Sequence, residues 1–199
     1  MNISWNKAVL AIKKGDIAVI PTDTIYGIVA SAGNQKAVAE LYRIRGRNPK
    51  KPCIMLCSAI SDLSNLGIDI DALGGVGLLS KIWPNPVSVI LPCSNKSLVY
   101  LHRGTKTLAI RIPKNKKLRD FLKKTGPIIA PSANPEGEAP AKNIKEAKCY
   151  FGGKVGVYIE GKVSKKVSTI ISLIDGQFKM IREGAWRVPK NIKLAVYNM

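Results

Sequence analysis

The chain has 199 residues, of which 46% are hydrophobic, and a formal net charge of +19. A domain of this length buries most of its unfolded surface without a disulfide or a metal, and the hydrophobic fraction argues against intrinsic disorder. No stretch reaches about 18 consecutive apolar residues, and the first residues lack the regions of a signal peptide. We therefore expect a cytoplasmic protein of one domain, residues 1–199, with no membrane span.

Periodicity and capping residues predict five helices. The first lies between Ser4, its expected cap, and Gly15. The others are expected over residues 35–44, 71–82 and 116–124, and from the cap Asn143 to residue 150.

Short apolar runs predict strands at residues 17–20, 53–57, 87–91, 107–112 and 128–130. Two further strands, 170–174 and 177–181, flank Asp175-Gly176, which is a two-residue hairpin signal. Because strands alternate with helices early and form a hairpin late, we expect an α/β fold with a twisted mixed sheet.

The positive charge is concentrated in the second half of the chain, with +5 in residues 1–100 and +14 in residues 101–199. Such an excess favours contact with phosphates, either of a nucleotide or of a nucleic acid. A lysine-rich surface that is merely solvated would give the same count, so charge alone leaves both interpretations open.

The cysteines form no CxxC pair, and His102 is the single histidine. We therefore predict no metal site, and we expect reduced, mostly buried thiols at Cys53, Cys57, Cys93 and Cys149. A nucleophilic Cys–His pair would have to recruit His102 and is the less favoured alternative.

Generic enzyme signatures are missing from the sequence, which has no GxGxxG after a strand, no GxxxxGK[ST], no HExxH and no GxSxG. Polar and basic residues instead follow the predicted strands, where open α/β sheets bind ligands. They occur at residues 21–27 (PTDTIYG), 45–47 (RGR), 131–134 (PSAN), and at Arg111, Ser168 and Arg182. The planar guanidinium of arginine can donate two parallel hydrogen bonds to the oxygens of a phosphate or a carboxylate. Taken singly, each segment is also explained by a turn, a solvated loop, a chance tripeptide or sheet-edge polarity.

In their order along the chain, these segments resemble the YrdC/TsaC family, the threonylcarbamoyl-AMP synthases, over roughly residues 4–187. Further carriers of the resemblance are Lys51-Pro52, Trp83-Pro84-Asn85-Pro86, Arg111-Ile112-Pro113, Ser168-Thr169-Ile170-Ile171 and Arg182-Glu183-Gly184. Two positions depart from the family pattern: Arg45 stands where a lysine is usual, and Asn85 stands where a glycine is usual. Asn85 fits there if its φ is positive, since asparagine adopts that region readily. The longer members carry an extra C-terminal domain, so the resemblance is to the short, single-domain type.

The resemblance implies a twisted mixed sheet with flanking helices and a basic concave cavity. It implies an enzyme that condenses L-threonine, bicarbonate or CO₂, and ATP to threonylcarbamoyl-adenylate and pyrophosphate, with Mg²⁺ accompanying ATP. A separate transferase complex then delivers the threonylcarbamoyl group to an adenosine of certain tRNAs, and direct tRNA binding by this chain is left open.

The resemblance also assigns roles to single residues. Arg45 and Arg47 hold phosphates or the carbamate and are the catalytic candidates. Ser132, Asn134 and Arg182 are expected with them on the ATP side. Residues Thr22, Thr107, Arg111 and Ser168 are expected on the threonine side, and Asp23 is an open candidate for a supporting carboxylate.

Two rival classes remain. A non-catalytic module that binds double-stranded RNA or tRNA would need exposed aromatic or arginine side chains for stacking. A carbamoyl-transfer domain like that of hydrogenase-maturation proteins is less favoured, because this sequence lacks their acylphosphatase-like and zinc-finger regions.

Overall fold

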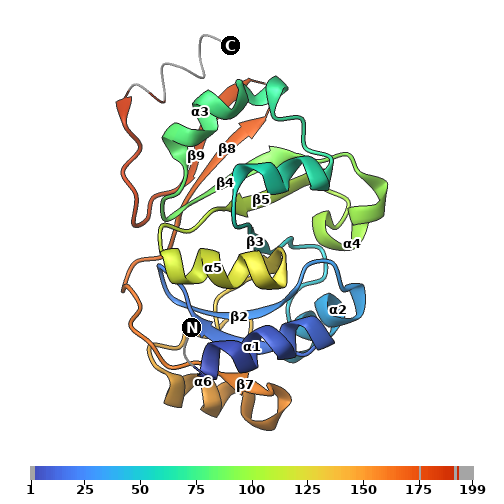
Figure 1. Ribbon diagram of the computed structural model, residues 1–199, viewed down its shortest axis with the longest axis vertical. Helices are drawn as coiled ribbons and strands as arrows, with labels where there is room; N and C mark the ends of the chain where they lie inside the picture. Colours follow the sequence, from blue (N-terminus) through green and yellow to red (C-terminus); the bar gives the residue numbers. More distant parts are fainter. Residues whose placement is uncertain (1–2, 175, 191, 193–199) are drawn as a thin grey trace.

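The computed structural model describes residues 3–174, 176–190 and 192, which form a mixed nine-stranded sheet with helices on both faces (Figure 1). This arrangement confirms the predicted α/β class. The strands follow the order β7-β1-β2-β6-β3-β5-β4-β8-β9. β2 runs across the view of Figure 1 while β4, β8 and β9 run obliquely, which shows the twist of the sheet.

The strands are β1 Ala18–Pro21, β2 Tyr26–Ser31, β3 Ile54–Leu56, β4 Val87–Pro92, β5 Thr107–Arg111, β6 Ile128–Ile129, β7 Val157–Tyr158, β8 Thr169–Ile174 and β9 Gln177–Arg182. The α-helices are α1 Ile3–Lys14, α2 Gln35–Arg45, α3 Gly75–Ile82, α4 Val99–His102, α5 Lys116–Thr125 and α6 Ile144–Phe151. Short 3₁₀ segments cover η1 Ile60–Leu66, η2 Asp71–Leu73, η3 Lys96–Leu98 and η4 Gly152–Lys154. Within this described part of the chain, no helix is both long and apolar enough to cross a membrane.

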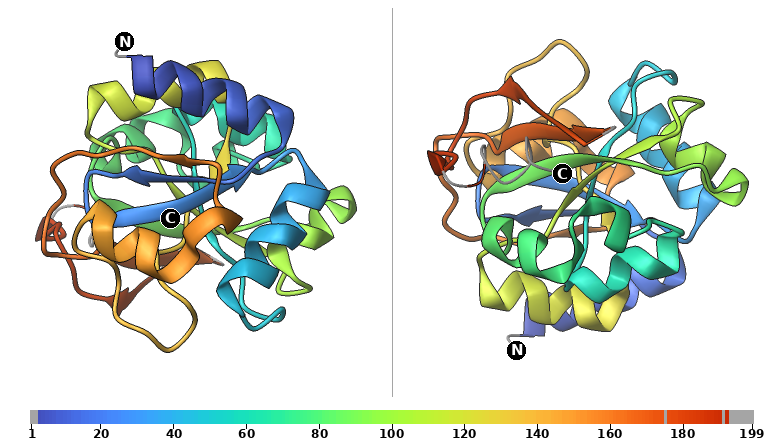
Figure 2. Two further views of the ribbon diagram at one scale, coloured as in Figure 1. Left: turned by 90° about the horizontal axis from the view of Figure 1, so that it is seen from below. Right: turned by 90° about the horizontal axis from the view of Figure 1, so that it is seen from above.

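Alternation along the strands divides the buried side chains between two cores. Ala18 and Ile20 of β1 pack in a core beneath α1 and α5, whereas Val19 faces the core beneath α2. Trp5 of α1 meets Phe121 of α5 edge to face, with ring centroids 5.3 Å apart. Figure 2 shows α1 and α5 side by side on one side of the sheet, with α2 and α6 on the other.

Parallel and antiparallel pairings are mixed. β1 pairs with β7, β3 with β5, and β4 with β8 in parallel, and the remaining neighbours are antiparallel. The β8–β9 pair is the predicted hairpin, with Ile174 opposite Gln177 and Gly176 at a φ of 66°. Asp175, the other residue of that hairpin signal, lies outside the described residues.

Several local expectations need correction. α1 already begins at Ile3, so Ser4 lies within the helix and does not cap it. The helix expected over residues 71–82 is broken at Gly74, whose φ is 82°, so that η2 and α3 replace it. β2 occupies residues for which we expected no strand. Among the described residues, the non-glycine positions with positive φ are Arg103 and Lys106, so Asn85 does not adopt a positive φ.

Other expectations are confirmed. Asn143 caps α6 by accepting a hydrogen bond from the backbone N–H of Glu146. Gly15, with a φ of 90°, ends α1. The structure adds a helix end that we did not predict: Gly46 ends α2 in the left-handed region, with a φ of 59°, and thereby turns the chain from Arg45 toward Arg47.

Candidate active site

A cavity of about 500 Å³ lies over one face of the sheet. This volume falls in the range of small-molecule sites. Its described lining carries three arginines and no Asp or Glu: Arg47, Arg111 and Arg182. Seven hydroxyl-bearing side chains also line it: Thr22, Thr24, Tyr26, Thr105, Thr107, Ser132 and Ser168. Fixed positive charge with many hydroxyls suits an anionic ligand.

The floor of the cavity follows from strand register. Ile54 of β3 lies opposite Ala109 of β5, and Ala109 lies opposite Ile90 of β4, so these three apolar residues form a row. Thr107 and Arg111 share the face of Ala109, because side chains on a strand alternate. They lie roughly 13 Å apart along β5, so the strand carries a hydroxyl at one end of the floor and a cation at the other.

Arg111 is held by two polar side chains of the loop after β1, Asp23 and Thr24. Its Nη2 lies 3.5 Å from Oδ1 of Asp23, and its Nη1 lies 3.1 Å from Oγ1 of Thr24. Its Nε is buried and has no hydrogen-bond partner among the described residues. Burial lowers the pKa of Arg111, Asp23 opposes this, and the charge of Arg182 lowers it further. Two guanidiniums with one carboxylate leave an excess of positive charge.

Arg182 lies at the end of β9 and is held by the residue that precedes β8. Its Nη2 donates to the carbonyl of Ser168 at 2.8 Å and lies 3.2 Å from the Ser168 hydroxyl. That hydroxyl lies 3.1 Å from the hydroxyl of buried Ser88. This chain of contacts fixes both Ser168 and Arg182 at the cavity wall.

Thr22 lines the cavity, but its hydroxyl is already engaged. Oγ1 donates to the carbonyl of Ile25 at 2.7 Å and accepts the backbone N–H of Thr24 at 3.1 Å. The side chain therefore shapes the loop between β1 and β2, the loop that also supplies Asp23 to Arg111.

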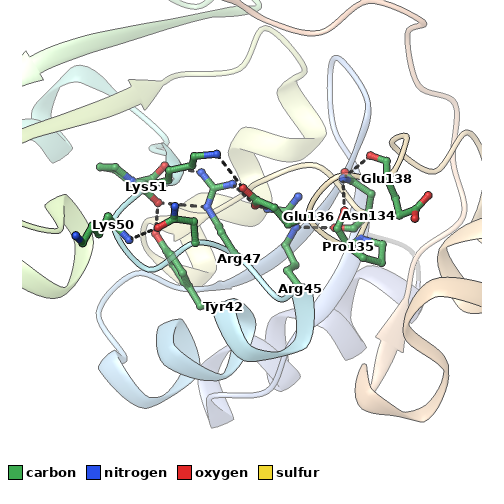
Figure 3. A network of polar contacts seen from close by, with 11 residues as sticks. Tyr42, Arg45, Arg47, Lys50, Lys51, Asn134, Pro135, Glu136 and Glu138 are labelled. Atoms are coloured by element: carbon green, nitrogen blue, oxygen red, sulfur yellow. Dashed lines mark hydrogen bonds and ion pairs between the residues drawn. The ribbon is translucent and has the colours of Figure 1, made fainter.

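Arg47 lies just beyond α2 and is tied to the segment that leads into β3. Its Nη2 donates to the carbonyl of Pro52 at 2.8 Å and its Nε to that of Lys51 at 3.3 Å. The Tyr42 hydroxyl donates to the same Lys51 carbonyl at 2.8 Å. Figure 3 shows Glu136 with Arg47, Lys51 and Arg45 around it.

Arg45 and Asn134 lie outside the cavity lining, next to the residues Arg47 and Ser132 that belong to it. Arg45 is 3% exposed, and its Nε donates to the backbone carbonyl of Asn134 at 2.7 Å. The Asn134 amide donates to the carbonyls of Pro135 and Glu138, which closes the loop after β6. Neither residue lines the cavity. The pair thus supports the loop that carries Ser132.

The structure brings seven of the nine residues expected from sequence into one cavity: Thr22, Arg47, Thr107, Arg111, Ser132, Ser168 and Arg182. Sequence reasoning missed Thr105, Ser88 and Glu136, and it included Thr24 in a candidate segment without assigning it a role. Thr24 stands two residues from Thr22 inside the quoted motif, so that spacing was an available signal. Glu136 carries no such signal.

The thiols lie mostly where they were expected. Cys53, Cys57 and Cys93 are buried, Cys149 is exposed, and all four are free. Burial raises the pKa of Cys57. Burial also raises the pKa of Cys53, although the positive charges of Arg47 and Arg45 oppose it.

The model of the Sua5/YciO/YrdC family, described as "Telomere recombination", matches residues 10–184. The chain belongs to this family. It is 30% identical over 159 residues to the threonylcarbamoyl-AMP synthase of Coxiella burnetii, which covers 79% of this chain and 85% of that protein.

Solved structures agree with this assignment. P. abyssi Sua5 complexed with L-threonine is 28% identical and superposes with a TM-score of 0.82 over 90% of this chain. The chain spans about half of that protein, 54% of its length. E. coli YciO is 26% identical, with a TM-score of 0.78, and the match covers 92% of this chain and 90% of that one.

Proposed function

We propose that this chain is a nucleotidyltransferase that makes threonylcarbamoyl-AMP from L-threonine, bicarbonate or CO₂, and ATP, and releases pyrophosphate. One observation carries the proposal: a cavity with three arginines and no described carboxylate, on a fold similar to that of a threonine-bound Sua5. The product would supply a separate transferase complex that forms N6-threonylcarbamoyladenosine on tRNA. That role places the proposed reaction in the cytoplasm.

The proposed chemistry brings anions together. The neutral threonine amine adds to CO₂ and its nitrogen gives up a proton to water, which leaves an anionic carbamate. A carbamate oxygen then attacks the α-phosphorus of ATP. The new phosphorus–oxygen bond forms as the bond to the pyrophosphate oxygen breaks, and pyrophosphate leaves with that electron pair. Fixed positive charge and orientation help this step more than a titrating base does. Arginine suits it because the guanidinium remains charged at any physiological pH.

The threonine side is proposed at the Arg111 end of the floor. The excess positive charge of Arg111 and Arg182 over Asp23 fits an amino-acid carboxylate. Ser168 is fixed beside Arg182 and offers a hydroxyl. Thr22 borders this end and acts mainly by shape because its hydroxyl is already bonded. Thr107 lines the same cavity from the opposite end of β5, where its hydroxyl faces the rest of the bound substrate.

The ATP side is proposed along Arg47, Ser132 and Arg182. Arg45 and Asn134 act as positioning residues there, because they hold the Ser132 loop from behind. Mg²⁺ enters as part of the ATP substrate and is held mainly by phosphate oxygens and water. The described lining offers that ion hydroxyls but no carboxylate.

Pyrophosphate release tests the proposal. We expect release that requires ATP, threonine and bicarbonate together and falls to background when any one is omitted. Serine and valine in place of threonine measure the selectivity. A folded chain that binds double-stranded RNA but releases no pyrophosphate would instead support the non-catalytic alternative.

A further inference from the structure

The Glu136 carboxylate lies beside Arg47, a cation that we propose binds the phosphates of ATP. Its Oε2 lies 3.3 Å from Nη1 of Arg47 and 4.0 Å from Nη1 of Arg45, and its Oε1 lies 3.2 Å from Nζ of Lys51 (Figure 3). One carboxylate therefore faces three cations. Its side chain is 29% exposed, so it borders solvent.

Arg47 does not depend on Glu136 for its position. The carbonyls of Pro52 and Lys51 hold its Nη2 and Nε, and the Tyr42 hydroxyl fixes the Lys51 carbonyl in turn. The contact with Glu136 uses the remaining nitrogen, Nη1. Glu136 thus neutralises charge at a guanidinium that is already anchored.

Glu136 is an anion at neutral pH. Partial burial raises its pKa, but the hydrogen bond from Lys51 and the charges of Arg47 and Arg45 outweigh this and hold the pKa below its usual value. A carboxylate and a phosphate use the same N–H donors in the same planar geometry. Two such groups compete for one guanidinium when both are present.

The side chain can leave without unfolding the loop. The backbone N–H of Glu136 donates to the carbonyl of Arg45 at 2.8 Å, and the Asn134 amide closes the loop on the carbonyls of Pro135 and Glu138. None of these bonds involves the Glu136 carboxylate. Rotation about side-chain bonds alone would release Arg47 and Lys51.

We propose that Glu136 is an internal counter-anion that competes with the phosphates of ATP for Arg47, and so weakens ATP binding and sets its KM. This inference rests on the proposed function, because it takes ATP as the anionic ligand of Arg47.

The test compares Glu136→Gln with Glu138→Gln. Both remove one negative charge from the same loop, but Glu138 is exposed and takes part in no ion pair with the described residues, so it is the matched control. Glu136→Ala is a second variant in case glutamine keeps a hydrogen bond to Arg47. Calorimetric dissociation constants are measured for ATP and for inorganic tripolyphosphate.

We expect Glu136→Gln to bind both probes about three- to tenfold more tightly than the wild type, with Glu136→Ala at least as tight and Glu138→Gln unchanged. This gain in affinity should be smaller at high salt, because salt screens the electrostatic interaction that causes it. The KM for ATP should fall in the same proportion.

The remaining outcomes contradict either the inference about Glu136 or the proposed function. Unchanged or weaker binding of both probes by both Glu136 variants contradicts the inference, and weaker binding would make Glu136 a positioning residue. An equal gain in affinity in Glu138→Gln would show that only the net charge of the loop matters, and this result would also contradict the inference. If tripolyphosphate binding tightens but ATP never binds, the proposed function fails while the competition at Arg47 stands.

Discussion

Asp23 and Arg111 form an ion pair at the cavity, although one follows β1 and the other ends β5. Oδ1 of Asp23 lies 3.5 Å from Nη2 of Arg111, and the two side chains are 7% and 5% exposed. Asp23 is anchored on its other side, because its Oδ2 accepts the backbone N–H of Lys114. The pair therefore joins the loop between β1 and β2 to the segment between β5 and α5.

Replacing Asp23 with asparagine should destabilise the fold. The change leaves the buried Arg111 guanidinium without its counter-ion, which costs about 3–5 kcal/mol in comparable buried pairs. Urea unfolding measures the loss, and the KM for threonine should rise because Arg111 keeps only Thr24 as an anchor. A folded variant with unchanged stability and unchanged KM would show that the pair does not hold Arg111.

Replacing Arg47 with alanine should abolish most activity and leave the fold intact. Arg47 lines the cavity and is only 17% exposed, and the loss of a preorganised charge typically costs about 100-fold or more in turnover. Arg43→Ala is the matched control, since Arg43 lies in the last turn of α2, four residues before Arg47, pairs with Glu40 and is 68% exposed. Comparable losses in both variants would contradict a specific role for Arg47.

Arg45 should tolerate lysine better than alanine. Alanine leaves the buried Asn134 carbonyl without its donor, and we expect a loss of about 1–3 kcal/mol in the free energy of unfolding. A lysine ammonium can still donate to that carbonyl, so Arg45→Lys should lose less stability and keep its KM for ATP within about threefold. Equal effects of the two changes would show that the guanidinium shape is what the site requires.

The contribution of Glu136 to stability should depend on pH. Because its folded-state pKa is below the ordinary value of 4.5, its contribution is fully present above that value and is lost as the pH falls through the lowered pKa. The difference in unfolding free energy between wild type and Glu136→Gln is at most about 1 kcal/mol at pH 7, because the carboxylate and Lys51 are partly exposed. A difference that grows on acidification would contradict the pairing.

Local patterns in the sequence were enough to predict most elements of the fold. The run before Pro21 and the Asp175-Gly176 signal both predicted strands that the structure contains. β2 was missed because Gly27, Ala30 and Ser31 have low strand propensity, and only pairing with β1 and β6 makes that segment a strand. Gly74 interrupts the apolar pattern of residues 71–82 by a backbone conformation that periodicity does not register.

The candidate site, like the fold, was predictable from the sequence only in part. Motif order pointed to seven residues that the fold gathers in one cavity. It did not separate Arg47, which lines the cavity, from Arg45, which lies behind it, since both flank Gly46 in sequence. The side of the loop on which each arginine side chain lies is decided by its contact with Asn134 or Glu136, 89 positions away in the sequence. No local sequence pattern specifies contacts over that separation.

The central claim is that this cavity joins threonine, a one-carbon unit and AMP in one product. Mass spectrometry of a reaction with ATP, threonine and ¹³C-bicarbonate tests it most directly, with Arg47→Ala as the comparison. We predict an adenylate that carries threonine and one ¹³C atom, formed by the wild type and lost in Arg47→Ala. Folded wild-type protein that forms no such adenylate, or an adenylate without the ¹³C label, would contradict the account.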